Sequence, residues 1–76
     1  MAFQKVRAMM RRCAKGSWFE DKTHRYFIHY NGRVYQDFPN GGHGKFEVKL
    51  GIVRNVVRFF GLDEACAKKV VPGLPL

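Results

Sequence analysis

The spacing of hydrophobic residues predicts that the chain begins with an amphipathic helix. From Phe3 to about Lys15, apolar residues recur at intervals of three and four and make one stripe: Phe3, Val6, Met9, Met10 and Cys13. The opposite side carries basic residues spaced four apart: Arg7, Arg11 and Lys15. Gly16 is a natural stop for a helix. We therefore expect a helix that buries one side and exposes a basic row.

The pattern after Gly16 predicts three short β-strands: Ser17–Asp21, His24–Tyr30 and Arg33–Phe38. Trp18 is the expected anchor of the first strand. Asn31-Gly32 predicts a tight hairpin between the last two strands, because a type I′ turn needs positive φ at both central positions. Pro39 ends the third strand, since proline cannot donate a hydrogen bond to the sheet.

The second half of the chain predicts two more helices. Residues 49–60 carry an apolar arc nearly half the circumference wide: Ile52, Val53, Val56, Val57, Phe59 and Phe60. Gly61-Leu62 has the form of a helix C-cap with its hydrophobic contact. Asp63 can cap a short helix through about Val70, and residues 72–76 are expected to be a loose tail. The wide arc indicates that the C-terminal helix or another subunit covers it.

The order of these elements predicts the fold class. Helices segregated on one face of a three-stranded antiparallel sheet make an α+β two-layer domain, here with a short extra C-terminal helix. The 76 residues suffice for one domain, with a core over about 3–62 and the short helix and tail over 63–76. No uninterrupted apolar run approaches the roughly 18 residues of a membrane span, and the N-terminus lacks the apolar segment of a secretory signal.

The charge balance favours a polyanionic partner. Fourteen Lys and Arg face six Asp and Glu, which gives a formal net charge of +8. Such an excess is typical of nucleic-acid binding and less often of binding to an acidic membrane or protein. The row that contains Arg7 and Arg11 has a parallel in double-stranded RNA binders, which grip phosphates across a minor groove. The alternative is a solvated helix face.

The two cysteines predict neither a metal site nor a disulfide framework. Cys13 and Cys66 stand far apart in the sequence and match no ligand spacing. Cys13 lies on the apolar stripe, and we expect it to act as a small buried hydrophobic residue. We therefore expect a reducing compartment, the cytoplasm, and no cofactor.

The segment GIVRNVVRFFGL, Gly51–Leu62, is similar to the closing motif of the HicA-type mRNA interferase toxins. That motif has its arginine, its basic residue and its final Gly-Leu where this chain has Arg54, Arg58 and Gly61-Leu62. His24 stands where the family has a histidine at the start of the second strand. The resemblance spans about residues 5–62.

The resemblance implies a fold similar to double-stranded-RNA-binding domains, with the order α-β-β-β-α. It implies metal-independent cleavage of mRNA by His24 and inhibition by a HicB-like antitoxin protein encoded alongside. It also implies that Phe27 points towards the helices, so that Tyr26 and Tyr30 look outward with His24, towards bases or a partner protein. The family's usual Gly-Ser before the histidine is replaced by Lys22-Thr23. This departure leaves open the alternative that the chain is an inactive member of the family.

Histidine suits a ribonuclease because it can take the proton of the ribose 2′-OH near neutral pH. Cations must also hold the scissile phosphate and offset its developing charge. The candidates are two neighbours of His24, one loop residue and one residue at the start of the second long helix: Lys22, Arg25, Lys45 and Lys49. Thr23 can donate a hydrogen bond. Water, Tyr26 and His43 stay open as a second proton-transfer group, and His29 is expected to be structural, between sheet and helices.

Three functions remain after this reasoning. The leading interpretation is a small basic endoribonuclease, the toxin of a toxin–antitoxin pair, with His24 as general acid and base and without a metal. A noncatalytic RNA-binding module on the same scaffold is the first alternative, and a protein-interaction domain is the second. The sequence leaves open whether the chain forms a homo-oligomer. It does not indicate which RNA sequence or structure is preferred.

Overall fold

A computed structural model of the protein describes residues 1–41 and 46–76, so that Lys45 and His43 lie outside the described residues. The elements in chain order are α1 (Phe3–Cys13), β1 (Trp18–Asp21), β2 (Arg25–Tyr30), β3 (Arg33–Pro39), α2 (Leu50–Phe60) and α3 (Glu64–Val70). No helix in this described part is long and apolar enough to cross a membrane.

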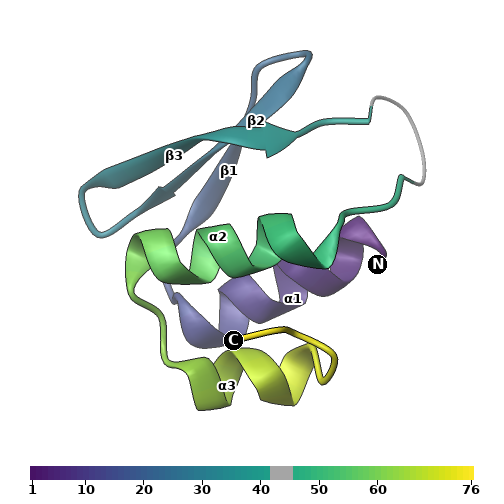
Figure 1. Cartoon of the computed structure of the whole chain (residues 1–76). Helices are drawn as coiled ribbons and strands as arrows, with labels where there is room; N and C mark the ends of the chain where they lie inside the picture. Colours follow the sequence, from purple (N-terminus) through teal and green to yellow (C-terminus); the bar gives the residue numbers. More distant parts are fainter. Residues whose placement is uncertain (42–45) are drawn as a thin grey trace.

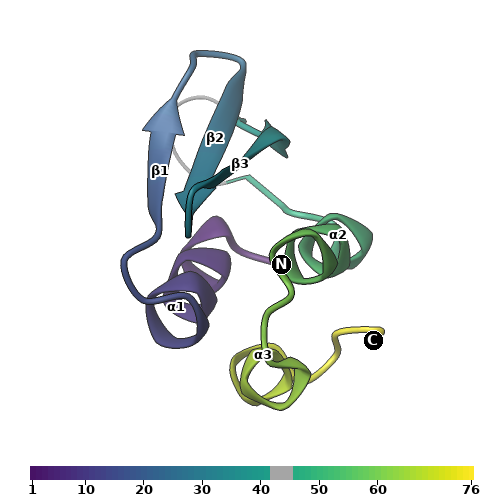
Figure 2. The same ribbon diagram turned by 90° about the vertical axis from the view of Figure 1, so that its left-hand side faces the viewer.

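The three strands form one antiparallel sheet in the order β1-β2-β3. Helices α1 and α2 lie side by side under one face of the sheet, and α3 lies beneath them on the side away from the sheet (Figures 1 and 2). The chain therefore has the expected α+β fold with the order α-β-β-β-α and a short extra helix. The other face of the sheet carries no helix in either view.

Local signals account for the ends of these elements. Asn31 and Gly32 have φ values of 54° and 79°, as the predicted type I′ hairpin requires. Gly61 ends α2 with a φ of 64°, and the Leu62 amide donates to the Val57 carbonyl at 3.0 Å. Asp63 caps α3 by accepting a hydrogen bond from the Ala65 amide at 3.0 Å. These three predictions are confirmed.

One hydrophobic core joins all three helices to the sheet. Its fully buried large side chains are Val6, Met9, Met10, Ile28, Phe38, Val48, Val53, Val56, Val57 and Val71. Leu74 is only 4% exposed and belongs to the same cluster, so the predicted loose tail over 72–76 is wrong. Val53, Val56 and Val57 of the apolar arc of α2 are buried in this core, and α2 packs against β3.

The structure reverses the predicted orientation of β2. Ile28 is fully buried, and the Tyr26 ring stacks on Phe3 with their centroids 4.9 Å apart. Tyr30 packs edge-on against Phe60. The face that contains Tyr26 and Ile28 therefore meets the helices, and Phe27 lies on the outer face. The alternation was ambiguous because both faces of this strand carry apolar residues, and the inward face was assigned wrongly.

A disulfide bond joins Cys13 at the end of α1 to Cys66 in α3, across a sequence separation of 53 residues. The prediction that Cys13 is a small buried hydrophobic residue outside any disulfide is therefore wrong. Packing of α3 against α1 brings the two Cα atoms to 5.8 Å, within the usual range for a disulfide. Two distant cysteines carry no spacing signal, so only the tertiary packing reveals this pair.

Candidate functional site

The turn between β1 and β2 presents His24 to solvent. The His24 amide donates to the Lys22 carbonyl at 2.8 Å, and the Lys22 amide donates to the Arg25 carbonyl at 2.8 Å. Thr23, between them, has a φ of 72°. A hydrogen bond across three residues with positive φ at the centre has the form of a γ-turn of the rare, strained kind. His24 thus lies in this turn and precedes β2, which begins one residue later than predicted.

Positive φ at Thr23 is notable because its branched side chain disfavours this conformation. Such strain costs of order 1–3 kcal/mol and persists only where surrounding contacts hold it, often at functional sites. The Lys22-Thr23 segment forms a tight turn without a glycine, and its strained conformation makes this turn the first candidate for a functional site.

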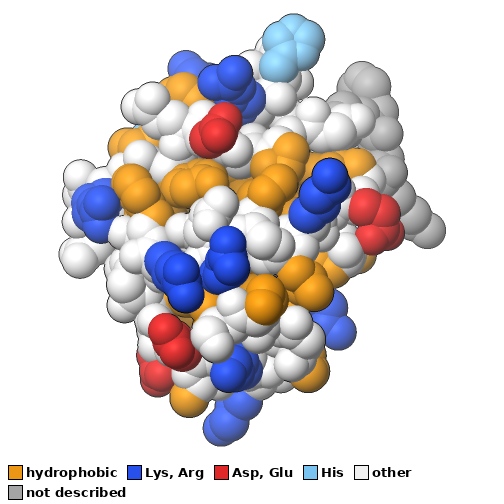
Figure 3. All heavy atoms as spheres, in the orientation of Figure 1, with side chains coloured by type: hydrophobic (Ala, Val, Ile, Leu, Met, Phe, Trp, Pro, Cys, Tyr) orange, Lys and Arg blue, Asp and Glu red, His pale blue; other side chains and the backbone are white. Residues whose placement is uncertain are grey.

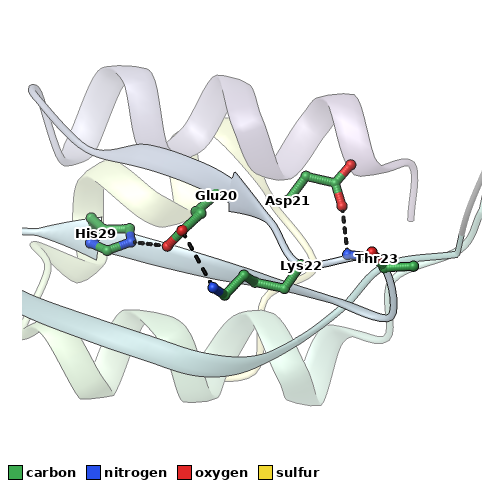
Figure 4. Close-up of polar contacts among 5 residues, drawn as sticks. All are labelled: Glu20, Asp21, Lys22, Thr23 and His29. Atoms are coloured by element: carbon green, nitrogen blue, oxygen red, sulfur yellow. Dashed lines mark hydrogen bonds and ion pairs between the residues drawn. The ribbon is translucent and has the colours of Figure 1, made fainter.

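Asp21 anchors the strained turn. Its carboxylate oxygen Oδ1 accepts a hydrogen bond from the Thr23 amide at 2.8 Å (Figure 4). The same oxygen accepts another from Asn40 Nδ2 at 2.9 Å. The second bond ties the turn to the segment that follows β3. Sequence reasoning missed Asp21, although an aspartate that bonds the amide two residues ahead is a recognised turn signal.

The turn brings together four of the predicted site residues: Lys22, Thr23, His24 and Arg25, all exposed. The Lys22 ammonium lies 3.5 Å from Glu20 Oε2 and 5.1 Å from the centroid of the Phe27 ring, so it points along the outer face of the sheet. The other predicted cations belong to other elements. Lys49 is the exposed N-cap residue of α2, and Arg7 and Arg11 belong to α1. No hydrogen bond or ion pair joins these three to the turn within the described ranges.

The ring of Tyr26, one of the open candidates for a second proton-transfer group, faces the helices. Its ring packs on Phe3 and edge-on against Phe19, whose centroid is 5.7 Å away. The tyrosine therefore belongs to the layer between sheet and helices. Of the other two candidates for a second proton-transfer group, water stays open, and His43 lies outside the described residues.

A second cluster lies on the outer face of the sheet, towards the other end of β1. The rings of Trp18 and His29 are stacked, with centroids 3.9 Å apart and planes 5° apart. His29 Nε2 lies 2.9 Å from Glu20 Oε1, and Glu20 also faces Lys22 (Figure 4). The prediction that His29 lies between sheet and helices is therefore wrong, and Trp18, the expected anchor of the first strand, is exposed on the outer face of the sheet. The error at His29 follows from the face assignment, because a strand turned over moves every side chain.

Glu20 is the acidic centre of this outer cluster. Its hydrogen bond with His29 is the largest influence and lowers the pKa of the Glu20 carboxyl below its ordinary value. Loss of hydration raises that pKa, and the nearby Lys22 charge lowers it. The ionised carboxylate is therefore favoured by the folded state.

Replacing Glu20 by glutamine should reduce the sensitivity of the fold to acid. A carboxyl whose pKa is depressed in the folded state stabilises the fold above the unfolded value, about 4.3, and loses that contribution as the pH falls through the folded value. We expect wild-type protein to lose more stability than Glu20→Gln as the pH drops below about 4.3. Urea unfolding of both proteins across an acid series measures this. Parallel stability curves would contradict the expectation.

Positive charge extends well beyond the turn. On the face shown in Figure 3, Lys and Arg side chains lie over the helices as well as near the sheet, with hydrophobic side chains between them. Among the described residues, no group of three or more His, Cys, Asp and Glu is placed to hold a metal ion. The surface thus offers cations and an exposed imidazole as its principal chemistry.

No family model, curated protein or solved structure matches this chain. The resemblance to HicA-type toxins therefore depends on the residues quoted for it, and a function must be argued from the turn and the outer face of the sheet.

Proposed function

We propose that this protein is a small RNA-binding endoribonuclease, the toxin of a toxin–antitoxin pair, and that His24 is its general base. The observation that carries the proposal is the strained turn, which is anchored by Asp21 and presents an exposed imidazole between Lys22 and Arg25. A strained backbone held by specific contacts is a feature of functional sites. The net charge of +8 supports a polyanionic substrate.

The proposed reaction uses the ribose as the nucleophile. A ring nitrogen of His24 takes the proton of the 2′-OH, and the 2′-oxygen forms a bond to the adjacent phosphorus. The bond from phosphorus to the 5′-oxygen of the next nucleotide breaks, and that oxygen takes a proton from water or from the imidazolium. The products are a 2′,3′-cyclic phosphate and a 5′-hydroxyl. Arg25 offsets the charge that develops on the phosphate, because it is exposed beside His24.

The location and partners follow from this proposal. The substrate is mRNA, which places the protein in the cytoplasm, and the expected inhibitor is a HicB-like antitoxin that covers the turn. Disulfides are rare in that compartment. Protein in the cytoplasm would then hold Cys13 and Cys66 as thiols and would be less stable than oxidised protein.

A noncatalytic RNA-binding module is the second candidate function. The observation that favours it is that the side chain of His24 makes no hydrogen bond within the described part of the chain, so nothing there fixes its orientation for proton transfer. In this alternative the turn and its cations bind phosphate, and the imidazole lines the site without reacting.

Incubation of purified protein with an mRNA transcript at low salt, with a metal chelator present, tests the proposal. We expect cleavage into fragments, and we expect binding that weakens with a slope of about −0.7 per phosphate contact on a logarithmic salt scale. RNA that is bound but stays intact would overturn the nuclease and support the RNA-binding module. RNA that is neither bound nor cut would favour a protein-interaction domain.

A further inference from the structure

We propose that Trp18 is a stacking site for one unpaired nucleobase, with Arg7 and Arg11 of α1 holding the adjacent phosphates. The choice of RNA as the ligand depends on the function proposed above. The site lies at the start of β1, whereas His24 lies in the turn after its end. It therefore adds a binding subsite for single-stranded RNA to the nuclease site.

The exposure of Trp18 requires an explanation. Its side chain is 54% exposed, more than any other large hydrophobic residue that the structure describes. Tryptophan is enriched at binding interfaces because its ring combines a large apolar area with an N–H donor. Trp18 lies on the outer face of an edge strand, where packing of the core does not need it.

Contacts on the outer face hold the indole in place before any ligand arrives. One face of the ring is covered by His29, which is itself held by Glu20 at 2.9 Å. Lys22 lies on the other oxygen of the same carboxylate at 3.5 Å. A ring fixed in this way loses little conformational freedom on binding, which favours affinity. Figure 4 shows the part of this chain of contacts that runs from His29 through Glu20 to Lys22 in the turn, and the Trp18 ring stacks on His29.

The indole is still 54% exposed with His29 stacked on one of its faces, which leaves the opposite face as the proposed surface for a base. His29 belongs to β2, so it stacks on the side of the indole that faces β2, away from the free edge of β1. At the outer edge of β1 a shallow depression of about 270 Å³ is lined by Arg7, Met10, Arg11, Ser17, Trp18 and Phe19. An aromatic wall beside two guanidinium groups is the combination that single-stranded nucleic acids use: stacking for the base and positive charge for the backbone.

The lining chemistry favours nucleic acid over an acidic protein or a lipid surface. Both charged residues that line the depression are arginines, and the Arg7 guanidinium is 5.9 Å from the centroid of the Phe19 ring. This contact keeps the guanidinium next to the depression. A duplex already stacks both faces of its bases, so an exposed indole selects unpaired bases. The four residues of β1, at about 3.3 Å each, place Trp18 roughly 13 Å from the turn, within reach of one short strand.

The chain contains one tryptophan, so its fluorescence reports on this site directly. We would titrate the wild-type protein with a single-stranded DNA oligonucleotide, which lacks the 2′-OH and stays intact, and with an abasic oligonucleotide of equal length. We expect the base-containing strand to quench the fluorescence and to bind more tightly by roughly five- to a hundred-fold, the equivalent of one stacked base. Equal quenching and equal affinity for the abasic strand would overturn the proposal.

Variants locate the effect, with affinity measured by anisotropy of a labelled oligonucleotide. Trp18→Ala should weaken binding by roughly five- to a hundred-fold, and Trp18→Phe should restore most of it. Arg11→Ala should lower the salt slope by about 1. Leu50→Ala, at an exposed apolar residue 37% accessible, and Lys68→Ala, in α3, are the matched controls and should bind as wild type does. Thermal melting checks that each variant folds.

The two proposals fail in different ways. If wild-type protein cleaves RNA but Trp18→Ala binds the labelled strand as tightly as wild type, the stacking site is wrong and the nuclease stands. If the indole is quenched and Trp18→Ala binds weakly, but RNA is never cleaved, the stacking site stands and the nuclease is wrong.

Discussion

Replacing His24 by alanine is expected to lower the rate of RNA cleavage by about 100-fold or more while RNA binding changes little. The reason is that a positioned general base contributes about 10²–10⁴ to a rate. The cations of the turn remain in this variant, and the proposed mechanism assigns the binding of the phosphate to them. Single-turnover cleavage with protein in excess measures the chemical step, and anisotropy of a labelled strand measures binding.

The folded state supplies the control for this variant. His24 is exposed and makes no side-chain hydrogen bond in the described part of the chain, so alanine should change the free energy of unfolding by less than about 0.5 kcal/mol. Lys68→Ala, an exposed substitution in α3, should leave the cleavage rate unchanged. A His24→Ala protein that cleaves as fast as the wild type would show that the imidazole is not the base.

Removing the disulfide is expected to have the largest effect on stability. The bond between Cys13 and Cys66 closes a loop of 53 residues, and the chain-entropy relation gives about 4 kcal/mol for a loop of this length. A domain of this size has roughly 4–11 kcal/mol in total. The double variant Cys13→Ala, Cys66→Ala should therefore retain only part of the stability of the oxidised protein, with a melting temperature lower by roughly 15 °C or more.

Urea unfolding of the wild type with and without a reductant measures the same quantity in one protein. The reductant should lower the unfolding midpoint of the wild type and leave that of the double variant unchanged, since the variant has no bond to reduce. Identical midpoints for oxidised and reduced wild type would contradict the expectation. The disulfide stabilises the fold itself, because it holds α3 against α1, and α3 contributes Ala67 to the core.

The elements that sequence predicted well are those with local signals. The two-residue Asn31-Gly32 hairpin, the Gly61 C-cap and the Asp63 N-cap each depend on the backbone preference or side chain of one or two residues. Such signals act whatever the rest of the chain does. The order of elements, and with it the α+β class, followed from them.

The larger errors concern contacts between distant parts of the chain. The faces of β2 are both partly apolar, so the choice between Phe27 and Ile28 depended on the helices that meet the sheet. The docking of Leu74 and the disulfide likewise follow from the way in which the C-terminal segment packs under α1 and α2. A single sequence carries no pairing information for residues so far apart.

The candidate site likewise has one part that the sequence could predict and one part that only the structure shows. Lys22, Thr23, His24 and Arg25 come together because they are neighbours in one turn, which sequence alone could indicate. The strain at Thr23 and its anchor through Asp21 and Asn40 appear only in the structure. The Trp18–His29 stack depends on the register of β1 against β2, which pairs these two residues directly.

The most direct test of the proposed nuclease compares one sequence as RNA and as DNA. Wild-type protein is incubated with each strand in the presence of a metal chelator, and the ends of any fragments are analysed. We predict that the RNA is cut to fragments that end in a 2′,3′-cyclic phosphate, while the DNA is bound and stays intact, because it lacks the attacking hydroxyl. Intact RNA in a stable complex, or equal cleavage of the two strands, would contradict the proposal.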